Sequence, residues 1–517
     1  MTTSPHVSPD TPQPVSTRAW LGWLLLLVAS GATFGLGIMA ASILHRREEA
    51  AQKVPLRPID EMEMDAARWG ENYPREYDSY KRMQDSSSAT KTKYGGATQR
   101  DYLEETPANV ILFAGFGFGK DYRQARGHTH AIEDVTNTLR MKAEDANHNL
   151  VLDAKKPATC WTCKSPDVPR MMKKMGGPEK FYAAKFMDLK DDIKHPIGCY
   201  DCHEANTMKL QITRPALLEA LKRRDPNFDI EKVSHQEMRS LVCAQCHVEY
   251  YFKGKGNYLT FPWDRGFTPD KMEEYFDEKN FDGQEFADFT NAVSKTKIVK
   301  IRHPDYELYS TGIHAYRNVA CADCHMPYRT EGGVKFTDHH LQSPLHNISN
   351  SCAVCHRWSE QEIRSRVESI QDKVREARSR AEDALAKAHL DVAAAMEAGA
   401  KDEELAAARQ QIRRAQLKWD YIAASNGMGF HSPAEALRIL AGSVDLAGQA
   451  RLDSARIIAR HGYTQPIVYP DSSTKEKAQT LVKAFAAGKP PKLLPVSVHQ
   501  VQVVPGGEKP AEEAGHK

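Results

Sequence analysis

The sequence predicts a mainly α-helical protein with little β structure, in which bound prosthetic groups fill much of the core. Three observations support this prediction. The ten cysteines form five Cys-x-x-Cys pairs. The segment around these pairs, from about residue 106 to residue 356, has few long amphipathic periods and many Gly, Pro and Asp turns. After residue 356, long helical periods replace this pattern.

Four of the five Cys-x-x-Cys pairs are followed directly by histidine. They are Cys199-Cys202-His203, Cys243-Cys246-His247, Cys321-Cys324-His325 and Cys352-Cys355-His356. The first pair, Cys160 and Cys163, is followed by Lys164 instead. Two thiols for the porphyrin edge and an adjacent ligand for the iron are the requirements of c-type haem attachment. The sequence therefore predicts a multihaem cytochrome c with five covalently bound haem c groups. One of these haems takes lysine as its iron ligand.

Zinc sites, redox pairs and disulfide scaffolds are the other structures that Cys-x-x-Cys pairs build. A tetrahedral zinc site needs two pairs for each metal, which leaves one of five unmatched and does not explain the four histidines. A thioredoxin-like redox pair is usually single, and a disulfide scaffold is usually a short, cysteine-dense chain. Ten cysteines spread over 517 residues fit neither, so haem attachment is favoured.

The N-terminal part of the chain predicts a membrane segment. Residues 1–19, rich in Pro, Ser and Thr, are expected to be a disordered tail. Trp20 to Leu44 contains no charged residue and is long enough to cross a hydrocarbon core of about 30 Å. A retained anchor is favoured over a cleaved signal, because the apolar run exceeds the roughly 7–15 residues of a signal core and no small-x-small site ends it.

The orientation of this segment is set by the haems. Arg46 and Arg47 follow the span and argue against export by the positive-inside rule. Haem c attachment, however, takes place outside the cytoplasm, so we expect the protein on the periplasmic side of the cytoplasmic membrane, anchored by Trp20–Leu44. The net charge of +2 gives no case for a nucleic-acid partner.

Residues 45–356 form the predicted haem region, and residues 357–465 form a long-helix region. Apolar residues in the latter recur at alternating steps of four and three, as narrow seams on two helices separated by a turn at Gly399. The seams consist of Ile363, Val367, Ile370, Val374, Ala377, Ala381 and Ala384, then Leu405, Ala408, Ile412, Ala415, Trp419 and Ile422. They fit either an intramolecular hairpin or a dimer interface.

A third helix is predicted from Ser432-Pro433 to about His461-Gly462. Ser432 and Glu435 have the spacing of a capping box, and proline suits the first helical position. Residues 466–517 are expected to be a C-terminal tail.

Beyond the cysteine motifs, short segments of the chain closely resemble the pentahaem, ammonia-forming cytochrome c nitrite reductases. These segments are Arg126-Gly127-His128, Thr138-Leu139-Arg140, Cys246 to Phe252, His303-Pro304, Thr311-Gly312-Ile313-His314, Thr337-Asp338-His339 and His431 before Pro433. The resemblance covers roughly residues 60 to 480. It implies that residues 45–356 are a pentahaem catalytic region that reduces nitrite to ammonium with six electrons. Substrate would bind the open face of the lysine-ligated haem, and four bis-histidine haems would supply the electrons.

The resemblance also assigns individual residues. The second iron ligands would be His339 for the haem at Cys199, His128 for that at Cys243, His431 for that at Cys321 and His314 for that at Cys352. Arg140, Tyr250 and His303 would stand at the open face beside Lys164. Arg140 would hold the anion, Tyr250 would position substrate by its hydroxyl, and His303 would give protons near neutral pH, since imidazole titrates close to ~6.5.

Other functions of the same build remain open from the sequence. A multihaem electron-transfer cytochrome would have no substrate of its own, but it would need no lysine motif and no set of Arg140, Tyr250 and His303. A hydroxylamine or sulfite reductase is the other alternative. The resemblance further implies a membrane quinol-oxidising cytochrome as electron donor and a homodimer.

The sequence departs from the resembled family at one position. That family commonly holds calcium beside the active site with Glu and Tyr after the third haem motif and with a Lys-x-Gln-His segment. Here Glu249-Tyr250 is present, but the second segment reads Lys300-Ile301-Arg302-His303. Arginine has no acceptor atom and cannot ligate calcium through its side chain. We predict that calcium is absent and that Arg302 pairs with Glu249 in its place. The alternative is that Arg302 turns outward and calcium stays with fewer ligands.

Overall fold

The computed structural model of the chain describes residues 17–51, 57–85, 92–278, 281 and 283–495. It consists of two units, residues 1–58 and residues 59–517. In the first unit, helix α1 runs over Thr17–Ala51, and its stretch Arg18–His45 is long and apolar enough to cross a membrane. Residues 1–16 of the predicted disordered tail (residues 1–19) lie outside the described residues. The prediction is wrong for residues 17–19, which form the first turn of α1.

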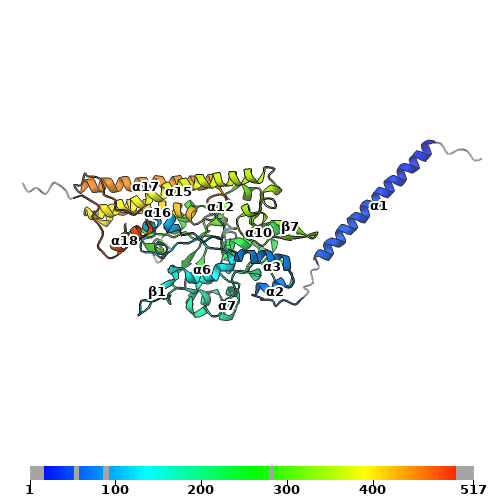
Figure 1. Cartoon of the computed structure of the whole chain (residues 1–517), viewed down its shortest axis with the longest axis horizontal. Helices are drawn as coiled ribbons and strands as arrows, with labels where there is room; N and C mark the ends of the chain where they lie inside the picture. The colour runs from blue at the N-terminus through cyan, green and yellow to red at the C-terminus, as the bar shows by residue number, and fades with distance from the viewer. Residues whose placement is uncertain (1–16, 52–56, 86–91, 279–280, 282, 496–517) are drawn as a thin grey trace, which may run out of the picture. The chain divides into compact units, whose positions relative to one another are not determined.

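Short helices, joined by turns and 3-10 segments, make up most of the second unit before residue 356 (Figure 1). They are α2 (Ala66–Gly70), α3 (Pro74–Lys81), α4 (Tyr102–Glu105), α5 (Ala108–Leu112), α6 (Ala131–Asn137), α7 (Asp167–Met175), α8 (Pro178–Ala183), α9 (Pro215–Arg224), α10 (His235–Ala244), α11 (Pro269–Asp277), α12 (Asp305–Ser310), α13 (Ile313–Tyr316) and α14 (Cys321–His325). The density of Gly, Pro and Asp explains why these helices stay short.

The β structure of the described residues is limited to two-stranded antiparallel hairpins. They pair β1 (Lys142–Glu144) with β2 (Leu150–Leu152), β3 (Tyr251–Lys253) with β4 (Tyr258–Thr260), β5 (Phe289–Thr290) with β6 (Lys297–Ile298), and β7 (Tyr328–Glu331) with β8 (Val334–Thr337). The prediction of a mainly α-helical fold with little β structure is confirmed.

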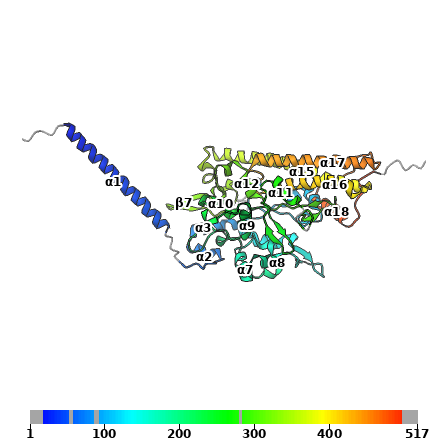
Figure 2. The same cartoon turned by 180° about the vertical axis from the view of Figure 1, so that it is seen from behind.

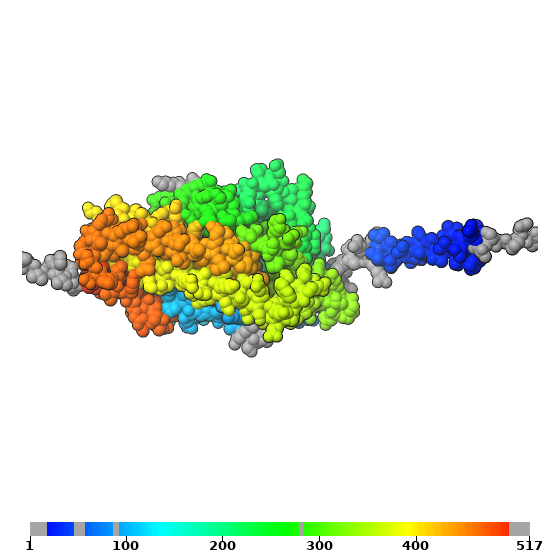
Figure 3. Space-filling view, turned by 90° about the horizontal axis from the view of Figure 1, so that it is seen from above, coloured from blue at the N-terminus to red at the C-terminus, as the bar shows by residue number. Residues whose placement is uncertain are grey.

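Three long helices pack side by side: α15 (Glu360–Glu397), α16 (Asp402–Ala423) and α17 (Pro433–Arg460) (Figures 1 and 2). They cover one face of the second unit (Figure 3). The turn between α15 and α16 contains Gly399 with φ of +97°, a conformation that glycine adopts without strain. All six predicted seam residues of α16 are buried, and α16 packs on both neighbours. The seams are therefore used within the chain, as the hairpin alternative expected.

Two local expectations differ from the structure. Ser432 is the N-cap of α17, but its side chain makes no capping hydrogen bond. Its backbone N–H donates to the Gly429 carbonyl at 3.3 Å, and Glu435 pairs with Arg438 at 2.7 Å. The predicted tail from residue 466 contains helix α18 (Lys475–Ala486), whose Leu481 and Phe485 pack into the core. About two turns of apolar residues were enough to fold this segment onto the rest of the unit.

A buried ion pair attaches the segment before α12 to the long helices. Lys300 Nζ lies 2.8 Å from Asp420 Oδ1 on α16, and the Ile301 N–H donates to Asp420 Oδ2 at 2.9 Å. Both charged side chains are almost fully buried, so removing either partner would cost about 3–5 kcal/mol. Because Ile301 lies two residues before His303, this contact holds the backbone that leads to His303.

Candidate active site and haem cavity

A single connected cavity of about 2940 Å³ runs through the second unit. It is lined by all ten cysteines, by Lys164 and by the four motif histidines. Cavities for one drug-sized ligand measure about 300–1,000 Å³, so this one has room for several large groups. The thiols, imidazoles and apolar walls therefore suit a set of covalently bound haems.

Four pairs of histidine rings face one another across this cavity. The ring centres of His128 and His247 are 6.2 Å apart, as are those of His203 and His339. The pairs His314–His356 and His325–His431 are separated by 6.4 and 6.3 Å. Two imidazoles that bind one metal from opposite sides at about 2.0–2.1 Å have ring centres about 6.3 Å apart. The structure thus brings together each of the four predicted ligand pairs.

Hydrogen bonds at Nδ1 fix the orientation of several of these rings. Nδ1 of His203, His339 and His325 lies 2.9, 2.9 and 3.1 Å from the carbonyl oxygens of Met208, Thr337 and Gln342. Such a bond selects the tautomer in which Nε2 carries the lone pair, as in metal-ligating histidines.

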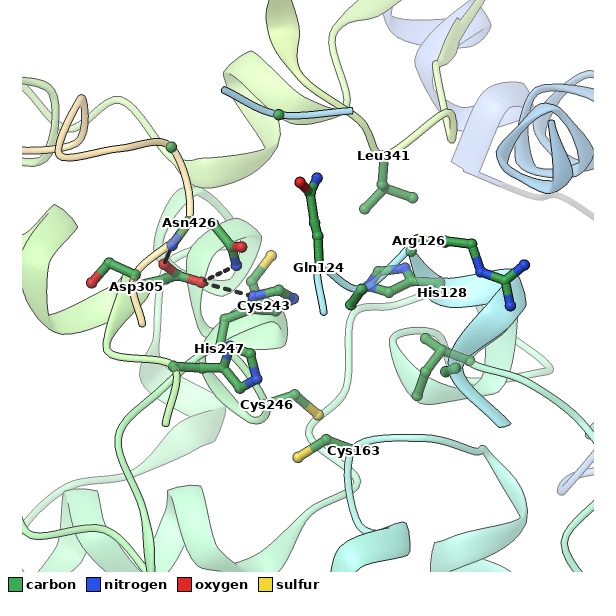
Figure 4. Close-up of a pocket in the computed structure, with 18 of the residues that line it drawn as sticks. Gln124, Arg126, His128, Cys163, Cys243, Cys246, His247, Asp305, Leu341 and Asn426 are labelled. Atoms are coloured by element: carbon green, nitrogen blue, oxygen red, sulfur yellow. Dashed lines mark hydrogen bonds and ion pairs between the residues drawn. The ribbon is translucent and has the colours of Figure 1, made fainter. Parts of the chain in front are cut away.

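His247 uses a carboxylate for the same purpose. Its Nδ1 lies 3.1 Å from Asp305 Oδ2, and Asp305 also accepts hydrogen bonds from the backbone N–H and side chain of Asn426 (Figure 4). Burial alone would raise the pKa of Asp305, but the hydrogen bond and charge of His247 lower this pKa to about 2. Asp305 is therefore a carboxylate at neutral pH that orients His247.

The thiols also show which attachment sites are neighbours. The sulfur atoms of Cys163 and Cys246 point toward one another (Figure 4). Helix α10, which carries Cys243, packs against α14, which begins at Cys321. The lysine motif therefore lies next to the third cysteine pair, which lies next to the fourth.

Arg140, Tyr250 and His303 come from three different segments of the chain and line the cavity together with Lys164. Arg140 belongs to the 3-10 turn η5 (Leu139–Met141), and its Nε donates to Thr138 Oγ1 at 3.1 Å. Among the described residues, no carboxylate forms an ion pair with Arg140 within 4.0 Å. Burial lowers the pKa of Arg140, but an arginine stays charged at neutral pH. Its charge is thus available to an anion.

His303 and Tyr250 are both neutral at physiological pH. Burial, followed by the charges of Lys164 and His247, lowers the pKa of His303 to about 3, and Nδ1 is buried without a hydrogen-bond partner. This differs from the expected titration near neutral pH, because the sequence does not reveal the burial of the ring. Burial also raises the pKa of Tyr250 above its usual value, which keeps the phenol protonated.

Arg302 lies inside the fold between two carboxylates. Its Nη1 donates to Asp288 Oδ2 at 3.2 Å and to the Lys300 carbonyl at 2.6 Å, and Nη2 pairs with Asp288 Oδ1. Nη1 is also 3.6 Å from Glu249 Oε1, and the Arg302 backbone N–H donates to Glu249 Oε2. The guanidinium therefore occupies the space between Glu249 and the backbone before His303.

Comparison with known proteins decides the family. The family model of cytochrome c552 matches residues 65–492. The chain belongs to the cytochrome c552 family. The cytochrome c-552 of Bacteroides fragilis is 49% identical over 90% of this chain and 92% of its own length. That of Porphyromonas gingivalis is 48% identical, over 90% and 91%.

A solved structure extends the comparison to the fold. The catalytic subunit of the cytochrome c nitrite reductase from Desulfovibrio desulfuricans, in which two calcium sites are relevant to the structure, is 32% identical, with a TM-score of 0.72. The match covers 77% of this chain and 88% of that one. The resemblance seen in the motifs is confirmed: this member of the cytochrome c552 family is a multihaem c-type cytochrome of the nitrite reductase type. It is extracytoplasmic, because haem c is attached there.

Two carboxylates near the site of this cytochrome c552 family member were not predicted from the sequence. They are Asp288 and Asp420, the partners of Arg302 and Lys300. Asp288 immediately precedes the two-residue strand β5 and lies 14 residues before Arg302, in a stretch without a motif. Asp420 belongs to the polar face of a predicted helix, where an aspartate is usually solvated. The only signal for these carboxylates in the sequence was the presence of two cationic residues, Lys300 and Arg302, which need carboxylate partners if they are buried.

Proposed function

We propose that this protein reduces nitrite to ammonium, with six electrons and eight protons, at the haem held by Cys160, Cys163 and Lys164. One observation supports this most directly. Eight histidines form four facing pairs, whereas Lys164 shares its part of the cavity with Arg140, Tyr250 and His303. An iron with one protein ligand and one open position binds substrate, and an iron closed on both sides transfers electrons.

Each side chain at the open face has a task that its chemistry allows. The bound haem would supply the electrons to nitrite and an iron that holds its nitrogen. Arg140 would attract and orient the anion through Nη1 and Nη2, since Nε is already bonded to Thr138. Tyr250 would donate its phenolic hydrogen to an oxygen of nitrite or of later intermediates. These donors are fixed in place before substrate arrives, so little reorganisation is needed.

His303 would act as a neutral donor. With a pKa of about 3, its imidazole carries one N–H and no charge at neutral pH. A neutral imidazole can hydrogen-bond the substrate and pass a proton on, with replacement from water in the cavity. Lys164 must be an unprotonated amine to bind iron, and a bound metal favours that form.

The other four haems would carry electrons to this centre. Their ligands would be His203 with His339, His247 with His128, His325 with His431 and His356 with His314. The nearness of Cys246 to Cys163 and the packing of α10 on α14 support an order in which electrons reach the lysine-ligated haem through the third and fourth sites.

Ammonium quantitation with reduced viologen and nitrite tests the reaction. The proposed enzyme forms one ammonium for each nitrite consumed and six electrons supplied. A multihaem electron-transfer protein would oxidise no viologen in response to nitrite. Parallel assays with hydroxylamine and sulfite test the other enzymes of the same build, for which either compound would be turned over faster than nitrite.

We further propose that Arg302 takes the place of the calcium ion beside the active site. The guanidinium contacts Asp288, Glu249 and the Lys300 carbonyl, so a cation already lies among these oxygen atoms. A divalent ion at the same point would meet a fixed positive charge. The reductase from Desulfovibrio desulfuricans has two calcium sites in its catalytic subunit.

The surroundings of the protein are proposed on the same basis. Helix α1 would anchor it on the periplasmic side of the cytoplasmic membrane, and N-terminal sequencing of the purified protein tests whether Trp20–Leu44 is retained. A membrane quinol-oxidising cytochrome would be the electron donor.

A homodimer is supported by four exposed apolar side chains near the fifth cysteine pair, and sedimentation of the purified protein tests it. These side chains are Ile313, Tyr316, Val354 and Trp358.

A further inference from the structure

The ring of Phe118 lies against the guanidinium group of Arg140. The guanidinium carbon is 4.2 Å from the ring centre, well within the roughly 6 Å at which a cation is attracted to an aromatic face. Phe118 belongs to the 3-10 turn η3 (Gly117–Gly119), which lines the same cavity as Arg140. Phe118 and the Thr138 hydroxyl are thus the two groups that hold the head of Arg140.

The same ring also contacts the other side of the site. Lys300 Nζ lies 4.7 Å from the centre of Phe118. Lys300 opens the segment that leads to His303, so a single ring touches cations from both segments that build the open face. Because Lys300 is already paired with Asp420, it does not compete for the anion.

Neighbouring aromatic rings hold Phe118 in place. Phe116 stacks on it at 5.8 Å, Phe113 lies tilted at 5.6 Å and Tyr122 meets it edge-on at 4.9 Å. Each such pair contributes about 0.5–1.5 kcal/mol beyond area burial. The ring is therefore a rigid support, and its orientation does not depend on Arg140.

A glycine allows the turn to approach the core this closely. A Cβ on Gly119 would lie 2.7 Å from the Phe113 carbonyl oxygen, which real side chains essentially never show. On the other side of Phe118, a Cβ on Gly117 would be in ordinary contact with Cγ of Arg140, at 3.4 Å. The backbone after Phe118 thus lies directly against the core, and the backbone before it lies beside Arg140.

We propose that Phe118 is a positioning residue that sets the affinity for nitrite through Arg140 and so favours an anionic over an uncharged substrate. This inference rests on the proposed function, in which Arg140 binds nitrite. Arg140 lacks an ion-pair partner among the described residues, so its long side chain needs another restraint to keep Nη1 and Nη2 directed at the anion. The negative face of the ring supplies that restraint without neutralising the charge.

The test compares Phe118→Leu with Phe118→Tyr. Leucine keeps an apolar side chain but removes the aromatic face, whereas tyrosine keeps the face. Steady-state kinetics are measured with nitrite and with hydroxylamine, which is largely uncharged at pH 8. For Phe118→Leu we expect KM for nitrite to rise about 3- to 10-fold, with kcat and the hydroxylamine parameters within about twofold of wild type. Phe118→Tyr should keep the wild-type KM.

The substrate comparison separates positioning from a general structural effect. Equal changes for nitrite and hydroxylamine, or no change for nitrite, would overturn the inference. Phe118→Met fills the space without a π face and replaces the leucine variant if that variant loses haem, as judged by its absorption spectrum. The variant Arg140→Gln separates a failure of the proposed role of Arg140 from a failure of the inferred role of Phe118. A normal KM for nitrite in this variant would refute the proposed role of Arg140 and the inference together. A raised KM in Arg140→Gln alone would refute only the role of Phe118.

Discussion

Replacing Arg302 with glutamine removes the cation that lies between Asp288 and Glu249. The side chain of Glu249 is fully buried and that of Asp288 is 10% exposed. Removing one partner of a buried ion pair costs about 3–5 kcal/mol, because the remaining charge, here that of Asp288, is left without compensation. Glutamine, unlike arginine, has a carbonyl oxygen that can ligate calcium. We therefore expect Arg302→Gln to be destabilised and to become calcium-responsive.

The size of the calcium response follows from mass action. If the variant binds calcium with a Kd of about 0.1 mM, then 10 mM calcium stabilises it by about 2.7 kcal/mol, more than half of the smallest expected loss. The assay is urea unfolding followed by haem absorbance, after chelator treatment and again with 10 mM calcium. Wild type should give the same midpoint in both conditions.

The stability difference between wild type and Arg302→Gln should also grow at alkaline pH. Burial raises the pKa of Glu249 to about 8, against the opposing charge of Arg302. A carboxyl with a raised folded pKa favours folding while protonated, and this contribution is lost as pH rises from the unfolded pKa to the folded one. Without Arg302 the folded pKa rises further, so the variant continues to lose stability above pH 8 where wild type does not.

A matched substitution at the surface provides the control. Arg223 pairs with Asp264 at 2.8 Å, but both side chains are more than a third exposed. Arg223→Gln should therefore change stability by less than about 1 kcal/mol and show no calcium effect. Stoichiometric calcium in wild type that supports its activity would refute the replacement, as would an Arg302→Gln variant indifferent to calcium with wild-type stability.

Four further predictions concern the haem ligands and the proton donor. His303→Asn should lower kcat with nitrite at least about 100-fold at unchanged haem content, and an unaltered rate would remove His303 from the mechanism. Because the pKa of His303 is about 3, its imidazole is neutral above that pH and should cause no acidic limb near pH 6.5; such a limb, present in wild type and absent in His303→Asn, would contradict this. His431→Ala should remove one of the two histidine ligands of the haem at Cys321 and leave its iron with an open position. Carbon monoxide titration should then count two binding haems where wild type shows one. Gly312→Ala places a Cβ 2.0 Å from the His431 carbonyl oxygen and should increase the high-spin fraction of the spectrum above that of wild type, which an unchanged spectrum would disprove.

The attachment residues were predictable because covalent haem binding is local. Two thiols and an adjacent ligand must reach one porphyrin, and this requirement fixes the spacing in the sequence. The facing histidines His128, His314, His339 and His431 come from distant segments. No spacing predicts them, and their prediction rested on short motifs that the structure then brought into pairs.

The helices show the same division between local and long-range information. The α16 seam followed from a repeated apolar period, which predicts a buried face wherever the helix packs. Helix α18 was missed because its buried residues, Ala478, Leu481 and Phe485, recur at helical spacing over only about two turns. The capping box at Ser432 does not form: the Ser432 N–H donates to the Gly429 carbonyl, and Arg438, one turn into the helix, pairs with Glu435. A competing ion pair of this kind cannot be judged from spacing alone.

The charges around the open face explain why an anion would be bound there. Lys300 is paired with Asp420 and Arg302 with Asp288, so each of these cations is balanced by a neighbouring carboxylate. Arg140 has an aromatic ring and a hydroxyl as its neighbours, and no carboxylate within ion-pair distance among the described residues. A buried charge without compensation is costly to the fold unless a ligand completes it. In the proposed function, nitrite would complete the charge of Arg140 and so recover the stability that the fold gives up there.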